Sequence, residues 1–179
     1  FVADKLGLAN AGDKKFNVEF TGGDPADNNA TFFFNGAMDV IKPYIDKGTV
    51  VVPSGQTTFE QVGTAQWDTS KALSRFQNIL GSYYSNGTRL DAAICSNDST
   101  ALGVTQAVAT LNLGEAILKG EKPDASLIEK SGWSFDCTYD TSSYNNGSAV
   151  IPSYLLVPVT VTKDNIQKEL IDTGYYTMG

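Results

Sequence analysis

The chain has no histidine among its 179 residues. Histidine is the commonest general base, the usual partner of the nucleophile in serine and cysteine triads, and a frequent zinc ligand. A catalytic mechanism would therefore have to rely on carboxylates, lysine or tyrosine. We expect neither an enzyme nor a metal site.

The chain also has little positive charge. It carries 13 Lys and Arg against 20 Asp and Glu, a net charge of -7, and no cluster of basic residues. Such a field repels phosphate backbones and anionic lipid, so we expect no nucleic-acid partner. No apolar run approaches the roughly 20 residues that a membrane-spanning helix needs. The first residues, FVAD, include neither Met nor a signal peptide, as expected of a processed or trimmed chain.

Cysteine is scarce, and nucleotide-binding motifs are absent. The two cysteines, Cys95 and Cys137, have no metal-binding spacing, and Cys95 ends an apolar run, which favours a buried thiol over a disulfide. Gly22-Gly23 belongs to neither a Gly-x-Gly-x-x-Gly pattern nor a Walker pattern. We therefore expect no cofactor.

What is present is a hydrophobic periodicity that alternates between strands and helices. Strands are predicted over 16–20, 49–53 and 90–95, and helices over 30–47, over 69–86 and from about 101. This order predicts an α/β fold with a doubly wound, mostly parallel sheet. Asp68 can cap the second helix. That helix carries an apolar stripe of Ala72, Leu73, Phe76, Ile79, Leu80 and Tyr83.

Three loops follow the predicted strands, over 24–29, 56–67 and 96–100. In such sheets, ligands bind where strand ends lead into helices. Asp and Asn side chains match the hydroxyls of a sugar, and an aromatic face packs on its C–H side. The loops supply Asp27, Asn28, Asn29, Trp67, Asn97 and Asp98.

Other roles for these residues stay open. Asp and Asn before a helix commonly serve as caps, and a lone Trp commonly belongs to a core or a lid. Three carboxylates, Asp27, Asp68 and Asp98, could also form a glycosidase pair if two of them had the required separation.

The helical periodicity fails after residue 108. Val104, Val108 and Leu111 share one face of a helix, whereas Leu113 and Ile117 lie on the opposite side. Either this helix is buried all round, or two unrelated helices are joined between 108 and 113. Further on, Pro152 and Pro158 interrupt an extended segment, which indicates edge strands or a crossing between domains. A final short helix is predicted from 163 to near Gly174.

Several stretches in order resemble a known family. The chain is similar to bacterial extracellular sugar-binding proteins of ABC importers, in the branch that binds xylose and multiple monosaccharides and has the type I periplasmic binding fold. The matching stretches are GGDPADNNA (22–30), NGAMD (35–39), VPSG (52–55), QWD (66–68), LDAAICSNDSTALG (90–103), AILKG (116–120), IPSYLL (151–156) and IDTGYY (171–176).

The resemblance implies two α/β lobes that close on one monosaccharide without catalysis. Asp27, Asn29 and Asn97 would hydrogen-bond the sugar, and Trp67 would stack on its ring. Asp98 would cap the following helix, with Asn28 a bystander. The segment 152–158 would lead through a hinge.

The chain also departs from the family, whose members are nearly twice as long. The first lobe should precede Phe1, and a second block should lie near 108–112, where the helical phase fails. We expect that those residues are deleted, or omitted and closed up in the numbering. The implied domains are a sugar-binding lobe over 1–108, a segment of the other lobe over 109–157, and a hinge return with terminal helix over 158–179.

The function implied is that of a solute-binding protein of an ABC sugar importer. It would bind a sugar of the xylose, glucose, galactose or arabinose type as a monomer and deliver it to the permease membrane subunits. It would act in the periplasm, or as a lipoprotein at the surface of a Gram-positive bacterium. The alternatives are the ligand-sensing core of a sugar-responsive transcription regulator and a carbohydrate-active enzyme.

Overall fold

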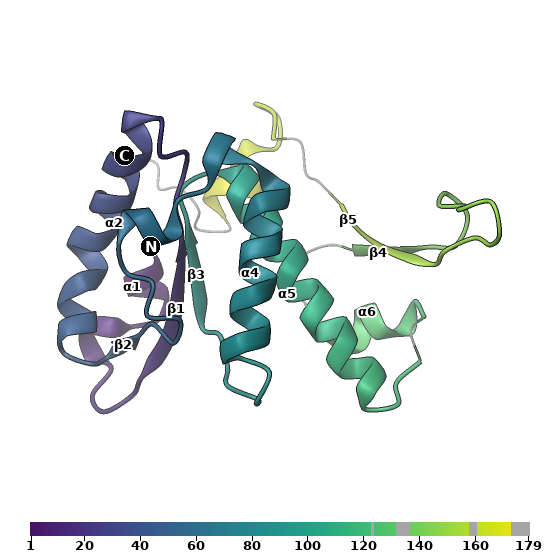
Figure 1. Ribbon diagram of the computed structural model, residues 1–179, viewed down its shortest axis with the longest axis horizontal. Coiled ribbons are helices and arrows are strands. Elements are labelled where there is room, and N and C mark those ends of the chain that lie inside the picture. Colours follow the sequence, from purple (N-terminus) through teal and green to yellow (C-terminus); the bar gives the residue numbers. More distant parts are fainter. Residues whose placement is uncertain (123, 132–136, 158–160, 173–179) are drawn as a thin grey trace. The chain divides into compact units, whose positions relative to one another are not determined.

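The chain divides into two compact units, Phe1–Asn112 and Leu113–Gly179. The computed structural model describes residues 1–122, 124–131, 137–157 and 161–172. Because the two units are not placed relative to one another, each is described by itself (Figure 1).

The first unit is built on a three-stranded parallel sheet. The central strand β1 (Phe16–Thr21) pairs with β2 (Val50–Val51) on one side and with β3 (Ala92–Cys95) on the other. The order β2-β1-β3 is that of a doubly wound sheet, as predicted. Strand β2 is shorter than the predicted 49–53, and beyond it the Ser54 amide donates to the Glu19 side chain.

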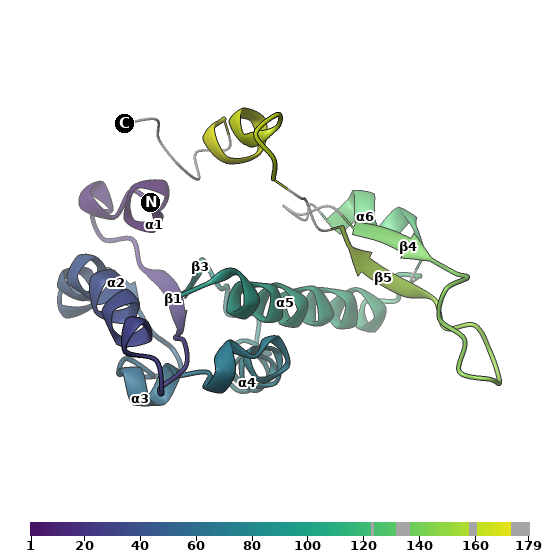
Figure 2. The same cartoon turned by 90° about the horizontal axis from the view of Figure 1, so that it is seen from above.

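Helices cover both faces of this sheet. Helix α2 (Asn28–Asp46) lies on one side of β1, and α4 (Thr69–Tyr83) and the start of α5 (Asp98–Leu118) lie on the other (Figures 1 and 2). Shorter helical segments are α1 (Val2–Lys5), η1 (Leu8–Asn10), α3 (Phe59–Val62) and η2 (Ala65–Trp67). Successive side chains of β1 point to opposite faces of the sheet. Val18 and Phe20 face α2, while Glu19 contacts Tyr84 at the end of α4.

The apolar stripes form the cores as predicted, with one exception at the end of α4. Phe34 and Ile41 of α2 are buried in one core, and Phe76, Ile79 and Leu80 of α4 in the other. Tyr83, assigned to the α4 stripe from sequence, is 41% exposed, and Tyr84 is buried instead. A side-chain hydrogen bond explains why Tyr84 is the buried one: its hydroxyl donates to buried Glu19 at 3.0 Å.

Helix α5 is continuous from Asp98 to Leu118 and begins three residues earlier than predicted. Val104 and Ala107 are buried, whereas Leu118 is 89% exposed, so the helix is not buried all round. Contrary to the expectation from the sequence, α5 is long and apolar enough to cross a membrane by length and composition. Gly103 packs against α4 so closely that a Cβ there would lie 2.4 Å from the Thr69 carbonyl oxygen. Such close helix packing is typical of a helix in a protein core.

The second unit contains an antiparallel pair of strands. β4 (Cys137–Asp140) pairs with β5 (Ser153–Leu156), and the unit also contains the end of α5, α6 (Ser126–Ser131) and the π-helical turn η3 (Gln167–Ile171). Tyr139 and Tyr154 pack with ring centroids 5.0 Å apart. Pro152 directly precedes β5, a position at which proline disturbs no ladder. The predicted crossing at Pro158 and helix end near Gly174 lie outside the described residues.

Candidate functional site

The first two predicted rim loops are joined by backbone hydrogen bonds beyond the carboxyl end of β1. The Gly22 amide donates to the Val62 carbonyl at 2.9 Å, and the Thr64 amide donates to the Gly23 carbonyl at 2.8 Å. The third loop reaches the same strand end, because the Ser96 amide donates to the Thr21 carbonyl at 3.1 Å. The strand order therefore gathers all three loops at one edge of the sheet, as predicted.

Asp27 uses both carboxylate oxygens in this rim. One oxygen accepts from the Asn29 amide at 2.9 Å and caps α2, and the other accepts from the indole Nε1 of Trp67 at 3.3 Å. Residues 40 positions apart are thus brought together. The capping role and the site role, which the sequence left as alternatives, are compatible because they use different oxygens.

Trp67 is held by two further contacts besides its hydrogen bond to Asp27. Its indole covers the Gly23 backbone so closely that a Cβ on Gly23 would come within 2.0 Å of the ring. Phe33 of α2 meets the indole edge-on, with centroids 6.3 Å apart. Gln66 and Trp67 both have positive φ, at 63° and 53°. A left-handed conformation costs such residues on the order of 1–3 kcal/mol each, so the surrounding contacts must hold the loop in place.

The two asparagines have different surroundings. The exposed Asn29 side chain makes no hydrogen bond to the described residues, so both its donor and its acceptor are available. The Asn97 Oδ1 accepts from the Thr100 amide at 2.9 Å and from its hydroxyl at 2.8 Å. Asn97 therefore caps α5, and the assignment of that cap to Asp98 was wrong: Asn97 precedes the first helical residue and has the required side-chain geometry.

The family is decided by sequence comparison. The profile described as "Periplasmic binding protein domain" matches residues 5–134. The chain belongs to this family.

Among curated relatives, the multiple sugar-binding periplasmic receptor ChvE of Rhizobium radiobacter is 36% identical, over 98% of this chain and 58% of its own length. The multiple sugar-binding periplasmic protein SbpA of Azospirillum brasilense is 34% identical, over 99% of this chain and 58% of its own length. This periplasmic binding protein domain thus spans somewhat more than half the length of these curated relatives. The predicted resemblance is confirmed.

A solved structure supports the fold. An ABC transporter solute-binding protein from Clostridium phytofermentans, solved with bound β-D-glucose, is 41% identical with a TM-score of 0.61. The match covers 98% of this chain and 63% of that chain. The type I periplasmic binding fold predicted from sequence is confirmed, and this chain spans part of that longer protein.

The comparisons also bear on the helical phase break. The matched stretch with ChvE or SbpA is 209 residues, longer than the 179 residues of this chain, so the relatives carry at least 30 residues with no counterpart here. That difference supports an internal loss. Its position at 108–112 stays a prediction, as do the three predicted domain ranges.

Sequence reasoning missed a buried polar network beneath the rim of this periplasmic binding protein domain. Glu19 is 0% exposed, and Arg75 of α4 donates to the carbonyl of Phe20 at 3.0 Å. Glu19 alternates with apolar residues in β1, a pattern that normally indicates a solvent-facing side chain, and Arg75 lies beside an apolar stripe. The usable signal was that helices were predicted on both faces of the sheet, which leaves no solvent-facing position.

The cysteine chemistry of the first unit is inert. Cys95 is a free thiol at the end of β3, as predicted. Burial raises the pKa of the Cys95 thiol to about 11, outweighing the opposite effects of a Thr21 hydrogen bond and the Arg75 charge. The thiol is therefore protonated at neutral pH and a poor nucleophile. Across the described ranges, no group of three or more acidic or cysteine side chains is arranged to hold a metal ion.

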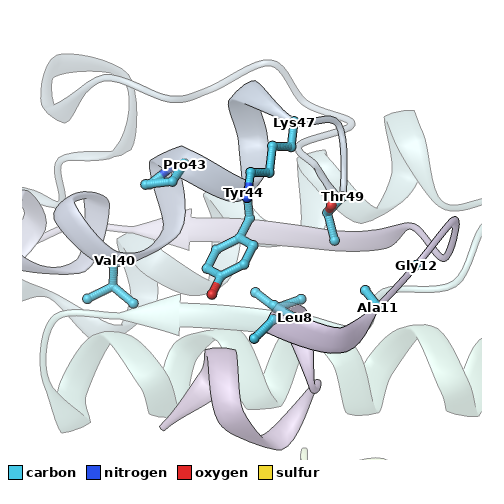
Figure 3. A pocket seen from close by; sticks show the side chains of 9 residues that line it. Leu8, Ala11, Gly12, Val40, Pro43, Tyr44, Lys47 and Thr49 are labelled. Carbon is cyan, nitrogen blue, oxygen red and sulfur yellow. The ribbon is translucent and has the colours of Figure 1, made fainter.

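A separate cavity of about 460 Å³ lies away from the rim. It is bounded by η1, the following turn and the last turns of α2, and Leu8, Val40, Pro43 and Tyr44 supply apolar walls (Figure 3). Ala11, Gly12 and Thr49, which also line it, precede β1 and β2. The cavity is therefore at the amino ends of these strands, whereas Asp27 and Trp67 follow a carboxyl end.

Proposed function

We propose that this chain is the larger part of one lobe, with a segment of the other, of an extracytoplasmic solute-binding protein that binds a monosaccharide. The observation that carries the proposal is the contact between Asp27 and Trp67 at the carboxyl end of a parallel sheet. It places a fixed aromatic ring beside a polar loop in a chain that is 41% identical to a protein solved with β-D-glucose.

The chemistry of the rim suits a sugar. Trp67 is half-buried, so part of the indole stays accessible for the C–H face of a pyranose after Gly23 has covered the other part. Asn29, with a free amide, can donate to one hydroxyl and accept from another. Asn97 contributes through its amide nitrogen, since its oxygen is used in the cap. Asp27 contributes chiefly by holding Trp67.

The relatives support a transport role. ChvE and SbpA are periplasmic sugar-binding proteins, and the solved relative is an ABC transporter solute-binding protein. We infer that the whole protein presents its sugar to ABC permease subunits outside the cytoplasm, as a monomer and without catalysis. A lipid anchor at the cell surface remains part of the proposal. The rim residues lie on only one side of the ligand, and the other lobe supplies the remaining contacts.

Titration calorimetry of the full-length protein with D-glucose, D-xylose, D-galactose and L-arabinose tests this function. We expect one-site binding of at least one sugar. Asn29→Ala should weaken it on the order of tenfold, which corresponds to about 1.4 kcal/mol. Asn28→Ala, a neighbouring exposed change, is the matched control and should bind like the parent. Failure of all four sugars to bind would overturn the proposal.

A further inference from the structure

The buried carboxylate of Glu19 is held by neutral donors. One oxygen of Glu19 accepts from the Ser54 amide and from the Tyr84 hydroxyl, each at 3.0 Å, and the other accepts from the Ser54 hydroxyl at 2.5 Å. Burial, followed by the Glu19 charge, raises the pKa of Tyr84 well above its usual value, so the phenol stays a donor. Glu19 thus fixes Ser54, which lies near the start of the loop that follows β2.

Arg75 fixes the next part of the same loop. One guanidinium nitrogen donates to the Phe20 carbonyl at 3.0 Å and to the Thr21 hydroxyl at 3.4 Å, and the other donates to the Gln56 side-chain oxygen. Burial lowers the pKa of Arg75, and the Glu19 carboxylate opposes that shift. The guanidinium therefore ties the end of β1 to the loop.

These contacts close into a ring. The Gln56 amide donates to the Ser54 hydroxyl at 3.1 Å, which completes the path from Glu19 through Ser54 and Gln56 to Arg75 and back to β1. Within the described ranges, Glu19 and Arg75 form no direct ion pair. Their charges compensate at longer range, through side chains that belong to the rim loop.

The ring leaves one donor unused. A guanidinium has only donors, so it selects the oxygen of the Gln56 amide and turns the NH2 group away. That NH2 group has no acceptor among the described residues, and Gln56 is half-buried at the start of the rim loop that ends at Trp67. We propose that Gln56 donates from this NH2 group to an oxygen of the bound sugar, and that Arg75 is the positioning residue that fixes its orientation. The inference rests on the proposed function.

The discriminating variant is Gln56→Glu. A glutamate keeps an oxygen for Arg75 and adds an ion pair, so the ring is preserved, but the donor is lost. We expect a thermal midpoint equal to or above that of the parent, together with at least a tenfold loss of affinity for the sugar that binds tightest in calorimetry. Gln56→Ala removes the donor and the oxygen together, and should lose at least as much affinity.

Arg75→Lys tests the positioning role, since lysine keeps the charge but not the two-pronged geometry. In the Arg75→Lys/Gln56→Glu double variant, the loss of affinity should be smaller than the sum of the two single losses, because both changes remove the same oriented donor. Gln56→Glu and Gln56→Ala binding within twofold of the parent would overturn the donor role, and strict additivity would overturn the positioning role. If Asn29→Ala weakens binding in the same experiment, only this inference fails. If the parent binds no sugar, both proposals fail.

Discussion

The indole Nε1 of Trp67 donates to the Asp27 carboxylate at 3.3 Å, which joins the loop before α2 to the loop before α4. The contact fixes an aromatic ring at the carboxyl end of β1, where ligands bind in sheets of this kind. It depends on a glycine beneath the ring, on a cap at Asp27 and on two residues with positive φ. Each of these dependences can be tested separately.

Gly23→Ala should displace Trp67. The added methyl would lie 2.0 Å from the indole, so either the ring or the backbone must move. Overpacking of this kind costs about 1–3 kcal/mol of unfolding free energy, and sugar affinity should fall with it. Gly36→Ala is the matched control: outside its own stretch of helix nothing lies within 4 Å of the new methyl, and it lies in α2, where alanine favours the helix. Equal stability of Gly23→Ala and the parent in urea unfolding would contradict this packing.

Asp27→Asn should release the ring while keeping the cap. Asparagine retains one side-chain oxygen for the Asn29 amide, but it cannot offer a second oxygen to the indole. We expect a loss of about 1 kcal/mol in unfolding free energy and weaker sugar binding. Asp24→Asn is the control, because Asp24 accepts from the Ala26 amide at 3.0 Å in a similar turn and, within the described residues, makes no hydrogen bond to Trp67. Equal effects of the two substitutions would show that only the turns matter.

Thr64→Val should leave stability unchanged or raise it by about 1 kcal/mol. Thr64 is 3% exposed, and its hydroxyl has no partner among the described residues, so the native protein bears its desolvation cost. Thr100→Val provides the contrast, since that buried hydroxyl donates to the Asn97 side chain at 2.8 Å and its loss should destabilise by about 1–2 kcal/mol. Chemical denaturation measures the unfolding free energy of both variants. A Thr64→Val variant as unstable as Thr100→Val would contradict the absence of a partner for the Thr64 hydroxyl.

Cys95 predicts a specific alkaline instability. Its folded-state pKa of about 11 lies above the usual 9.0, so the folded state retains the thiol proton that the unfolded state releases. The contribution is full below pH 9 and is lost as the pH rises toward 11, by on the order of 2 kcal/mol. Cys95→Ala should show a shallower fall in unfolding free energy over this window than the parent. Parallel curves for the two proteins would contradict the burial argument.

Local patterns predicted the sheet, its helices and the position of the three loops, because hydrophobic period and strand order are encoded residue by residue. The caps were predicted less well. Asp68 caps α4 as expected, with its side chain accepting from the Lys71 amide at 2.8 Å, but Asn97 rather than Asp98 caps α5. Adjacent Asn and Asp are equally suited by type, so the choice depends on a one-residue difference in where the helix begins.

Apart from the burial of Glu19, the polar ring of Glu19, Ser54, Gln56 and Arg75 could not be predicted from such patterns. Its members are separated by up to 56 positions, and each by itself is typical of a surface. Only the parallel pairing of β1 with β2 and the packing of α4 bring them together. The contact of Trp67 with Asp27 is of the same kind: both residues were identified as candidates, but their hydrogen bond was not.

The most direct test uses Trp67 as the reporter of its own site. The given 179 residues contain two tryptophans, so a full-length background in which Trp133 and every tryptophan outside these residues are replaced by Phe leaves Trp67 as the sole indole. Titration of that full-length variant with the sugar that binds tightest in calorimetry should change the Trp67 emission and saturate at the calorimetric dissociation constant. Full calorimetric binding with no change in Trp67 emission would place the sugar elsewhere and contradict the account.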